Sequence, residues 1–142
     1  MQTFFQTLLI VGILTAPALA QQPGPELVQA GVTAYNSHDI AYFEQHLADD
    51  VVWLDEDGHV INGRTSVLSF MRIQFNQTPA RTLSVSDVRV GSTSDAAWAT
   101  FSYMIMGGDA HLMGLNTTVF KRVGDDWQIA VVHGAINAEG HH

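Results

Sequence analysis

The sequence predicts an α+β fold in which three helices precede a curved sheet of long antiparallel strands. Two patterns carry this prediction: apolar side chains at helical spacing in the first half of the chain, and period-two alternation from residue 82 onward. Both faces of the late strands are partly apolar. We therefore expect the helices to cover one face and a second copy of the protein to cover the other.

The helices are marked by their spacing and by the residues at their ends. Pro25 suits the first turn of a helix that continues to Tyr35. The polar segment 36–39 breaks this helix and offers a cap for a second one, which covers residues 40–47. We expect Thr65 to cap a third helix, which ends at Thr78-Pro79.

The strands are separated by strong turn signals. A hairpin over residues 50–64 turns at Asp57-Gly58. An outer strand covers residues 82–90, and three long strands follow, joined by turns at residues 107–109 and 124–126. In the last strand, alternation places Ile129, Val131 and His133 on the same apolar face as Trp127.

The first 20 residues predict export. They carry no charged side chain, contain an apolar core at residues 8–14 and end in Ala18-Leu19-Ala20, a small-x-small cleavage signal. The apolar run is too short for a membrane span, so we expect a secreted or periplasmic protein with no membrane association after cleavage. The remaining chain divides into a linker (21–24), one domain (25–137) and a disordered tail (138–142).

Composition excludes several classes of function. The chain has no Cys, which rules out thiol chemistry and cysteine-based zinc sites. Its formal net charge of -8 repels phosphate backbones, so we expect no nucleic-acid binding. His111 and His133 fall on adjacent strands at positions about 17 Å apart, too far to share a metal ion. We therefore expect neither a metal nor a cofactor.

Asp55 is the leading candidate for a catalytic residue. Alternation places it on one strand face with Val51 and Trp53. If that face points inward, the carboxyl group lies in an apolar pocket, where burial would raise its pKa toward the range of a general base. The alternative is that residues 55–57 form a solvated acidic turn.

His133 and Tyr103 are candidate partners for Asp55. A histidine on the apolar face of a strand is either a hydrogen-bonded core residue or a proton donor or acceptor that lines a pocket. The predicted turn pairs His133 with Asn116 or Thr117, and the sequence leaves the register open. Tyr103 could face the same space or serve as a core aromatic residue.

A series of short motifs resembles a nuclear transport factor 2-like domain of the SnoaL-like kind. In order, they are Tyr35-Asn36-Ser37-His38-Asp39, residues 47–53, Gly58, Gly63-Arg64, and a close formed by Thr117-x-Val119-Phe120, Trp127-x-Ile129 and His133. The resemblance covers Pro25 to about Asn137. It implies a cone-shaped, cystatin-like fold whose sheet wraps around the helices, a deep pocket at the open end, and dimerisation through the outer sheet face.

That superfamily is functionally mixed, and fold alone does not define function. It includes ketosteroid isomerases, polyketide cyclases, dehydratases, the association domain of calcium/calmodulin-dependent kinase II and small binding proteins. Compared with ketosteroid isomerases, the resemblance places the catalytic aspartate on Asp55 but the oxyanion-hole tyrosine near Gly31 and the protonated aspartate near Thr117. An Arg that is common in binding members is Leu115 here, which argues against an anionic ligand.

Three functions remain open. The first is an exported homodimer that binds a small apolar or amphipathic molecule without a cofactor. The second is an isomerase, cyclase or dehydratase that uses Asp55 as general base with His133 or Tyr103 as partner. The third is a dimeric interaction module. We expect the pocket to be lined by Tyr35, Trp53, Phe70, Tyr103 and Thr117.

Overall fold

The computed structural model describes residues 22–108 and 110–137. The predicted signal peptide (1–20), the start of the linker and the predicted tail (138–142) lie outside the described residues. The helices are α1 (Glu26–Asn36), α2 (Ile40–His46) and α3 (Arg64–Phe75). The strands are β1 (Leu47–Leu54), β2 (Val60–Asn62), β3 (Thr82–Ser92), β4 (Ala96–Gly107), β5 (Ala110–Val123) and β6 (Asp126–Ile136). The predicted α+β class is confirmed.

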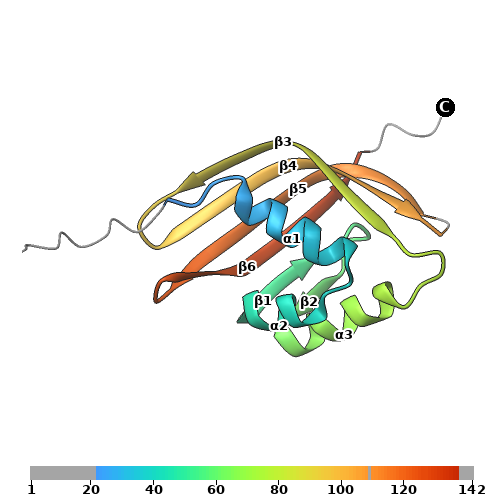
Figure 1. Cartoon of the computed structure of the whole chain (residues 1–142), viewed down its shortest axis with the longest axis horizontal. Coiled ribbons are helices and arrows are strands. Elements are labelled where there is room, and N and C mark those ends of the chain that lie inside the picture. Colours follow the sequence, from blue (N-terminus) through green and yellow to red (C-terminus); the bar gives the residue numbers. More distant parts are fainter. Residues whose placement is uncertain (1–21, 109, 138–142) are drawn as a thin grey trace, which may run out of the picture.

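One six-stranded sheet runs through the domain in the order β2-β1-β6-β5-β4-β3 (Figure 1). The β1–β2 hairpin and the neighbours from β6 to β3 are antiparallel, as their turn signals predicted. β1, however, pairs in parallel with β6, with Trp53 opposite Val132. The sheet is therefore mixed, and the early hairpin is attached to the last strand of the chain.

The helix ends follow local chemistry. Asp39 caps α2, because its carboxylate accepts a hydrogen bond of 3.1 Å from the backbone N–H of Tyr42. The third helix begins differently from the prediction: Gly63 is its N-cap, and Thr65 lies inside the first turn. Gly63 has a φ of +85°, a conformation that glycine adopts without steric cost.

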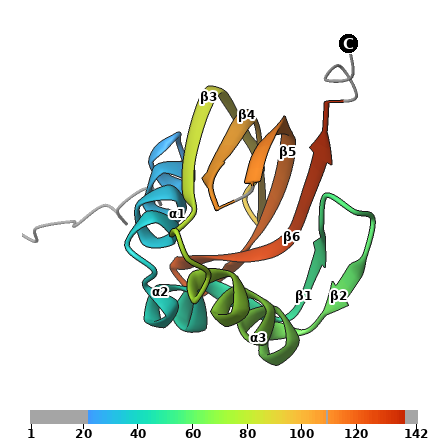
Figure 2. The same cartoon turned by 90° about the vertical axis from the view of Figure 1, so that its right-hand side faces the viewer.

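All three helices lie on one side of the sheet, which curves around them (Figure 2). The space between is filled by a core whose largest fully buried side chains are Leu47, Met71, Val51 and Val67. Burial of each such side chain contributes about 1.5–3 kcal/mol to folding. These four side chains pack α3 against β1.

A β-bulge in the last strand pair decides which residues face the helices. Val119 pairs with Val131, but Phe120 pairs with Ile129, so Ala130 is an extra residue in β6. The extra residue shifts the alternation by one position. Ile129 faces the core, whereas His133 lies opposite Thr117 on the outer face.

The outer face of the sheet carries exposed apolar side chains. Leu115, Met113 and Trp98 are 58%, 48% and 45% exposed. These three residues share the face of β4 and β5 that points away from the helices. No helix in the described part of the chain is both long and apolar enough to cross a membrane.

Candidate functional site

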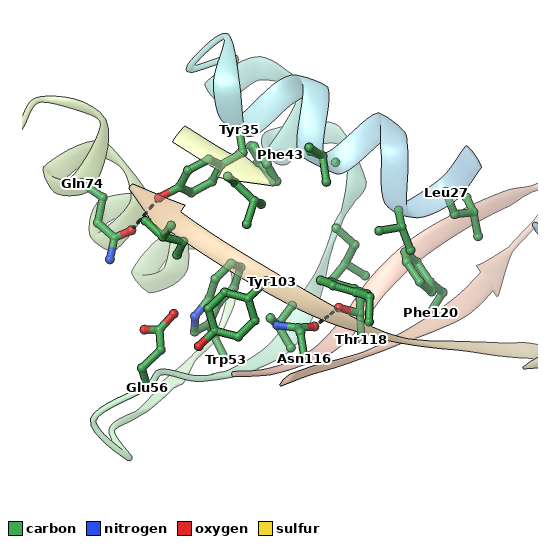
Figure 3. A pocket seen from close by; sticks show the side chains of 18 of the residues that line it. Leu27, Tyr35, Phe43, Trp53, Glu56, Gln74, Tyr103, Asn116, Thr118 and Phe120 are labelled. Carbon is green, nitrogen blue, oxygen red and sulfur yellow. Dashed lines mark hydrogen bonds between the residues drawn. The ribbon is translucent and has the colours of Figure 1, made fainter. Parts of the chain in front are cut away.

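A pocket lies between the helices and the inner face of the sheet (Figure 3). Its cavity has a volume of about 120 Å³. A dry cavity of about 150 Å³ can hold benzene, so this space suits a group of about that size or slightly smaller. Most of its wall is apolar: Leu27, Val28, Val32, Phe43, Trp53, Phe70, Leu83, Phe101, Ile105, Phe120, Ile129 and Val132.

Two glycines create room in this pocket. A Cβ atom at Gly31 of α1 would meet no heavy atom within 4 Å, so the helix leaves an open volume there. At Gly114 of β5, a Cβ atom would lie 2.9 Å from the ring of Tyr103 and would overlap the carbonyl oxygen of Ala135. Gly114 therefore lets the Tyr103 ring lie against the sheet and occupy the pocket wall.

The Tyr103 hydroxyl is the most unusual polar group of the pocket. Tyr103 is 5% exposed, and its hydroxyl has no hydrogen-bond partner among the described residues. Burial, with a smaller contribution from the charge of Glu56, raises the pKa of Tyr103 to about 12. The phenol therefore stays protonated at neutral pH, and it can donate a hydrogen bond to a molecule that enters the pocket.

The other polar groups of the pocket are partly paired. The Tyr35 hydroxyl donates to Oε1 of Gln74 at 3.4 Å, a long and weak hydrogen bond. Burial raises the pKa of Tyr35, the charge of Arg81 opposes this, and the charge of Glu56 adds to it. Deeper in the pocket, Thr118 donates to Oδ1 of Asn116 at 2.8 Å. The chemistry is thus concentrated at the end near Tyr103 and Gln74.

Glu56 brings a carboxylate to that same end. A Cβ atom built on Gly134 would lie 3.5 Å from Oε1 of Glu56 and 3.5 Å from the Tyr103 hydroxyl oxygen. The two oxygens therefore lie no more than twice that distance apart. Figure 3 shows the Glu56 side chain rising from the β1–β2 turn toward the pocket. A carboxylate and a protonated phenol can act there together, as a proton acceptor and a hydrogen-bond donor.

A second, more polar space of about 560 Å³ adjoins the pocket and shares Glu56, Phe70 and Gln74 with it. Its lining also includes Asp55, Asp57, Gln77, Thr78, Arg81, Gly108, Ala110, Leu112 and Ile136. We call this space the vestibule. It joins the apolar pocket to the loops at the open end of the domain.

Asp55 lies in the vestibule, and the expectation of a raised pKa was wrong. β1 ends at Leu54, and the Asp55 carboxylate accepts hydrogen bonds from the backbone N–H groups of Asp57 and His59, at 3.0 and 2.8 Å. The His59 ring lies 3.1 Å from its other oxygen. Burial would raise the pKa of Asp55, but the hydrogen bonds and charge of His59 and the Asp57 N–H outweigh it and lower the pKa. The carboxylate thus closes a turn, although its side chain is only 11% exposed.

The structure does not bring His133 and Thr117 to the pocket. Both side chains are exposed on the outer face of the sheet, where the two residues pair across β5 and β6. The bulge at Ala130 turns the His133 side chain to the outer face. In β5, the side chain of Thr118 lines the pocket, whereas that of Thr117 does not. Of the predicted lining residues, Tyr35, Trp53, Phe70 and Tyr103 do line it.

The β1–β2 turn also holds the one group of potential metal ligands found among the described residues. Ligand atoms of Asp55, Asp57 and His59 lie within 4.8 Å of one another. Hydrogen bonds within the turn already account for this clustering, since Asp55 accepts from both other residues. The turn therefore gives no separate reason to assign a metal site.

Sequence reasoning missed Glu56. It was considered only as part of the solvated acidic turn over residues 55–57. The available signal was the Asp55-Glu56-Asp57-Gly58 turn. An aspartate side chain can accept a hydrogen bond from the backbone N–H two residues later and so form a local turn, which ends the strand alternation.

The fold places the protein among nuclear transport factor 2-like and cystatin-like structures. A candidate dehydratase of the NTF2-like family from Streptomyces avermitilis superposes with a TM-score of 0.71 at 22% identity, over 78% of this chain and 90% of that one. A candidate ketosteroid isomerase from Shewanella frigidimarina superposes with a TM-score of 0.68 at 22% identity, over 78% of this chain and 92% of that one. A candidate calcium/calmodulin-dependent protein kinase type II association domain from Thiobacillus denitrificans superposes with a TM-score of 0.68 at 22% identity, over 81% of this chain and 96% of that one. At this level of identity the likeness shows the fold alone.

The family of SnoaL-like domains matches residues 25–139, nearly all of the predicted mature chain. No curated protein matches the chain at a significant level. The protein therefore belongs to the SnoaL-like domain family, as the motifs between Tyr35 and His133 indicated.

Proposed function

We propose that this protein binds a small, mostly apolar molecule in the pocket between the helices and the sheet. The single observation that carries the proposal is the unpartnered Tyr103 hydroxyl, buried in a pocket with mostly apolar walls. A buried hydroxyl without a partner costs about 1–3 kcal/mol, and a ligand group that forms a hydrogen bond with it reduces this cost. The ligand thus has an apolar body and one polar group.

Filling the pocket from α1 tests this proposal. Gly31→Leu places a side chain in open space, whereas Ala30→Leu places the same side chain on the exposed side of the same helix. Native mass spectrometry of the purified protein is expected to show a retained small molecule in the wild type and in Ala30→Leu, but not in Gly31→Leu. Retention of the same molecule by Gly31→Leu would refute binding in this pocket.

We propose further that the protein is exported and acts as a homodimer. The uncharged segment 1–20 supports export, with cleavage between Ala20 and Gln21. The exposed side chains of Leu115, Met113 and Trp98 support association through the outer sheet face. Intact-mass measurement of the exported protein tests the cleavage, and a species that keeps residues 1–20 would contradict it.

The dimer has its own test. Leu115→Glu places a charge in the proposed interface and is expected to give a monomer in light scattering, whereas the wild type gives twice the chain mass. Gln29→Glu, on the exposed surface of α1, is the matched control and should remain dimeric. A wild-type monomer at micromolar concentration would refute the homodimer.

A second candidate function is proton transfer of the isomerase or dehydratase type, with Glu56 as the base. The observation that favours it is the convergence of the Glu56 carboxylate and the Tyr103 hydroxyl on Gly134. Glu56 would accept a proton from the carbon between a carbonyl group and a double bond, and would return it to the far end of that double bond. Tyr103 would donate a hydrogen bond to the developing oxyanion. The Asp55 carboxylate, which we expected in this role, instead accepts hydrogen bonds from backbone N–H groups of the β1–β2 turn.

Conversion of 3-cyclohexenone to the conjugated 2-cyclohexenone, followed by ultraviolet absorbance, tests this second function. Glu56→Gln should abolish the activity, and Tyr103→Phe should reduce it about 100-fold. Asp55→Asn should retain most of it. Activity in Glu56→Gln equal to that of the wild type would exclude Glu56 as the base.

A further inference from the structure

The open end of the site is acidic. Of the described residues that line the vestibule, Asp55, Glu56 and Asp57 carry carboxylates, and Arg81 carries the single guanidinium group. The whole chain has a formal net charge of -8, so the surrounding field has the same sign. A molecule that reaches the pocket through the vestibule therefore passes a negative potential, which favours cations and opposes anions.

Glu56 is the acidic group that reaches furthest inward, because it lines both the vestibule and the apolar pocket. No ion pair within residues 22–108 and 110–137 includes Glu56, and no side-chain hydrogen bond within these residues involves its carboxylate. Arg81 lines the vestibule only, and it does not form an ion pair with Glu56. The Glu56 carboxylate is thus left with unused acceptor positions that face the site.

The Tyr103 hydroxyl is the second group without a partner at this end. It is buried, lines the pocket and lies within 3.5 Å of the same point above Gly134 as Oε1 of Glu56. A neutral carbonyl group could accept a hydrogen bond from Tyr103 but would leave Glu56 without a donor. A carboxylate on the ligand would be repelled by Glu56. A group with several N–H donors can reach both oxygens.

Aromatic rings line the apolar pocket that shares Glu56 and Tyr103. Trp53 and Phe70 line the pocket with their ring centroids 6.2 Å apart and their planes tilted by 59°. Phe70 also lines the vestibule, so it stands where the apolar and the acidic spaces meet. The face of an indole or phenyl ring attracts an organic cation, and this attraction adds to that of a carboxylate.

We propose that the ligand of this site is an amphipathic organic cation, with its ammonium group at Glu56 and Tyr103 and a compact apolar body in the inner pocket. This assignment rests on the proposed binding function and specifies its ligand class. The ammonium N–H groups donate to the Glu56 carboxylate and to the Tyr103 oxygen, while the body, about the size of a six-membered ring, fills the cavity of about 120 Å³.

Three probes that share one ring separate charge from shape: cyclohexylmethylamine, cyclohexylmethanol and cyclohexanecarboxylate. Their affinities for the purified protein are measured by isothermal titration calorimetry at pH 7 and low salt. The amine is expected to bind about tenfold more tightly than the alcohol, and the carboxylate more weakly than the alcohol. In Glu56→Gln the amine should lose its advantage, with affinity for the alcohol unchanged.

The control for Glu56→Gln is Asp125→Asn, which removes one negative charge from the β5–β6 turn at the opposite end of the sheet. It should keep the preference for the amine. Gly134→Ala is a second site variant, because its methyl group would stand 3.5 Å from both Glu56 and Tyr103 and should weaken amine binding without a steric clash. Thermal melts establish that each variant folds.

The outcomes separate this proposal from the broader one. Equal affinities for amine and alcohol would overturn the cation assignment and leave the apolar pocket as a binding site. Persistence of the preference in Glu56→Gln would overturn the role of Glu56. Failure of all three probes to bind would overturn both the ligand class and the pocket function.

Discussion

Replacing Tyr103 by phenylalanine should stabilise the free protein. The Tyr103 side chain is 5% exposed and its hydroxyl has no partner among the described residues, whereas the unfolded chain hydrates that hydroxyl fully. An unsatisfied buried hydroxyl costs about 1–3 kcal/mol. Since this one borders a cavity that can admit water, we take the lower end of that range. Tyr103→Phe should raise the free energy of unfolding by about 1 kcal/mol at pH 7.

The pH dependence provides a second readout of the same group. The pKa of Tyr103 is about 12 in the folded protein and 10.0 for an unperturbed tyrosine, so the native state holds the proton more tightly. This contribution to stability is complete below pH 10 and is lost as the pH rises from 10 to 12. The advantage of Tyr103→Phe over the wild type should therefore grow above pH 10.

Urea denaturation, followed by tryptophan fluorescence, measures both effects. Tyr35→Phe is the matched control, because the Tyr35 hydroxyl donates to Gln74, and its loss should be neutral or destabilising by up to about 1 kcal/mol. If Tyr103→Phe instead lowered the free energy of unfolding by about 1 kcal/mol or more, the Tyr103 hydroxyl would be hydrogen-bonded in the native state. That result would remove the observation on which the proposed function rests.

Three further predictions concern the surroundings of the site. Asp55→Asn should destabilise the protein by about 1 kcal/mol at pH 7, because charge-assisted hydrogen bonds in the β1–β2 turn are weakened. Since the pKa of Asp55 is lowered from 3.8, this difference should shrink in urea melts below pH 4, and a constant difference from pH 7 to pH 3 would contradict the turn role. Gly31→Ala should raise the free energy of unfolding by about 0.5–1 kcal/mol, because its methyl group meets open space and alanine favours a helix. A lower free energy of unfolding than in the wild type would mean that this space is filled. Gly114→Ala should cost about 3 kcal/mol or abolish folding, because the methyl group would overlap the Ala135 carbonyl and press on the Tyr103 ring; a change within about 0.5 kcal/mol in thermal melts would contradict the packing described.

The parts of the fold that sequence predicted are those decided by local patterns. These patterns act over a few residues: helical spacing, the Asp39 cap, and the turn residues at 107–109 and 124–126. The helices and strands that they predicted begin and end within a few residues of the observed bounds. Trp53 and Tyr103, which we expected to line the pocket, do line it. The parallel pairing of β1 with β6 joins residues about 80 positions apart, and no local pattern encodes it.

Each error at the site misplaces a position by one residue along the chain. The extra residue Ala130 moved His133 to the outer face. The family resemblance placed a site position near Thr117, whereas the neighbouring Thr118 lines the pocket. β1 ends at Leu54, so the Asp55 carboxylate accepts hydrogen bonds from the backbone N–H groups of Asp57 and His59, and Glu56 lines the pocket. Period-two reasoning is reliable only between such irregularities, and functional sites gather at strand ends and bulges.

Mapping of ligand binding by nuclear magnetic resonance tests the central claim most directly. The purified protein, labelled with ¹⁵N, is titrated with cyclohexylmethylamine and with cyclohexylmethanol. Binding in the pocket predicts saturable shifts at the Trp53 indole N–H and at the amides of Gly31 and Gly134, with those of Leu115 and Thr117 on the outer face unchanged. Saturable shifts confined to the outer face, or none at the Trp53 indole, would contradict the account.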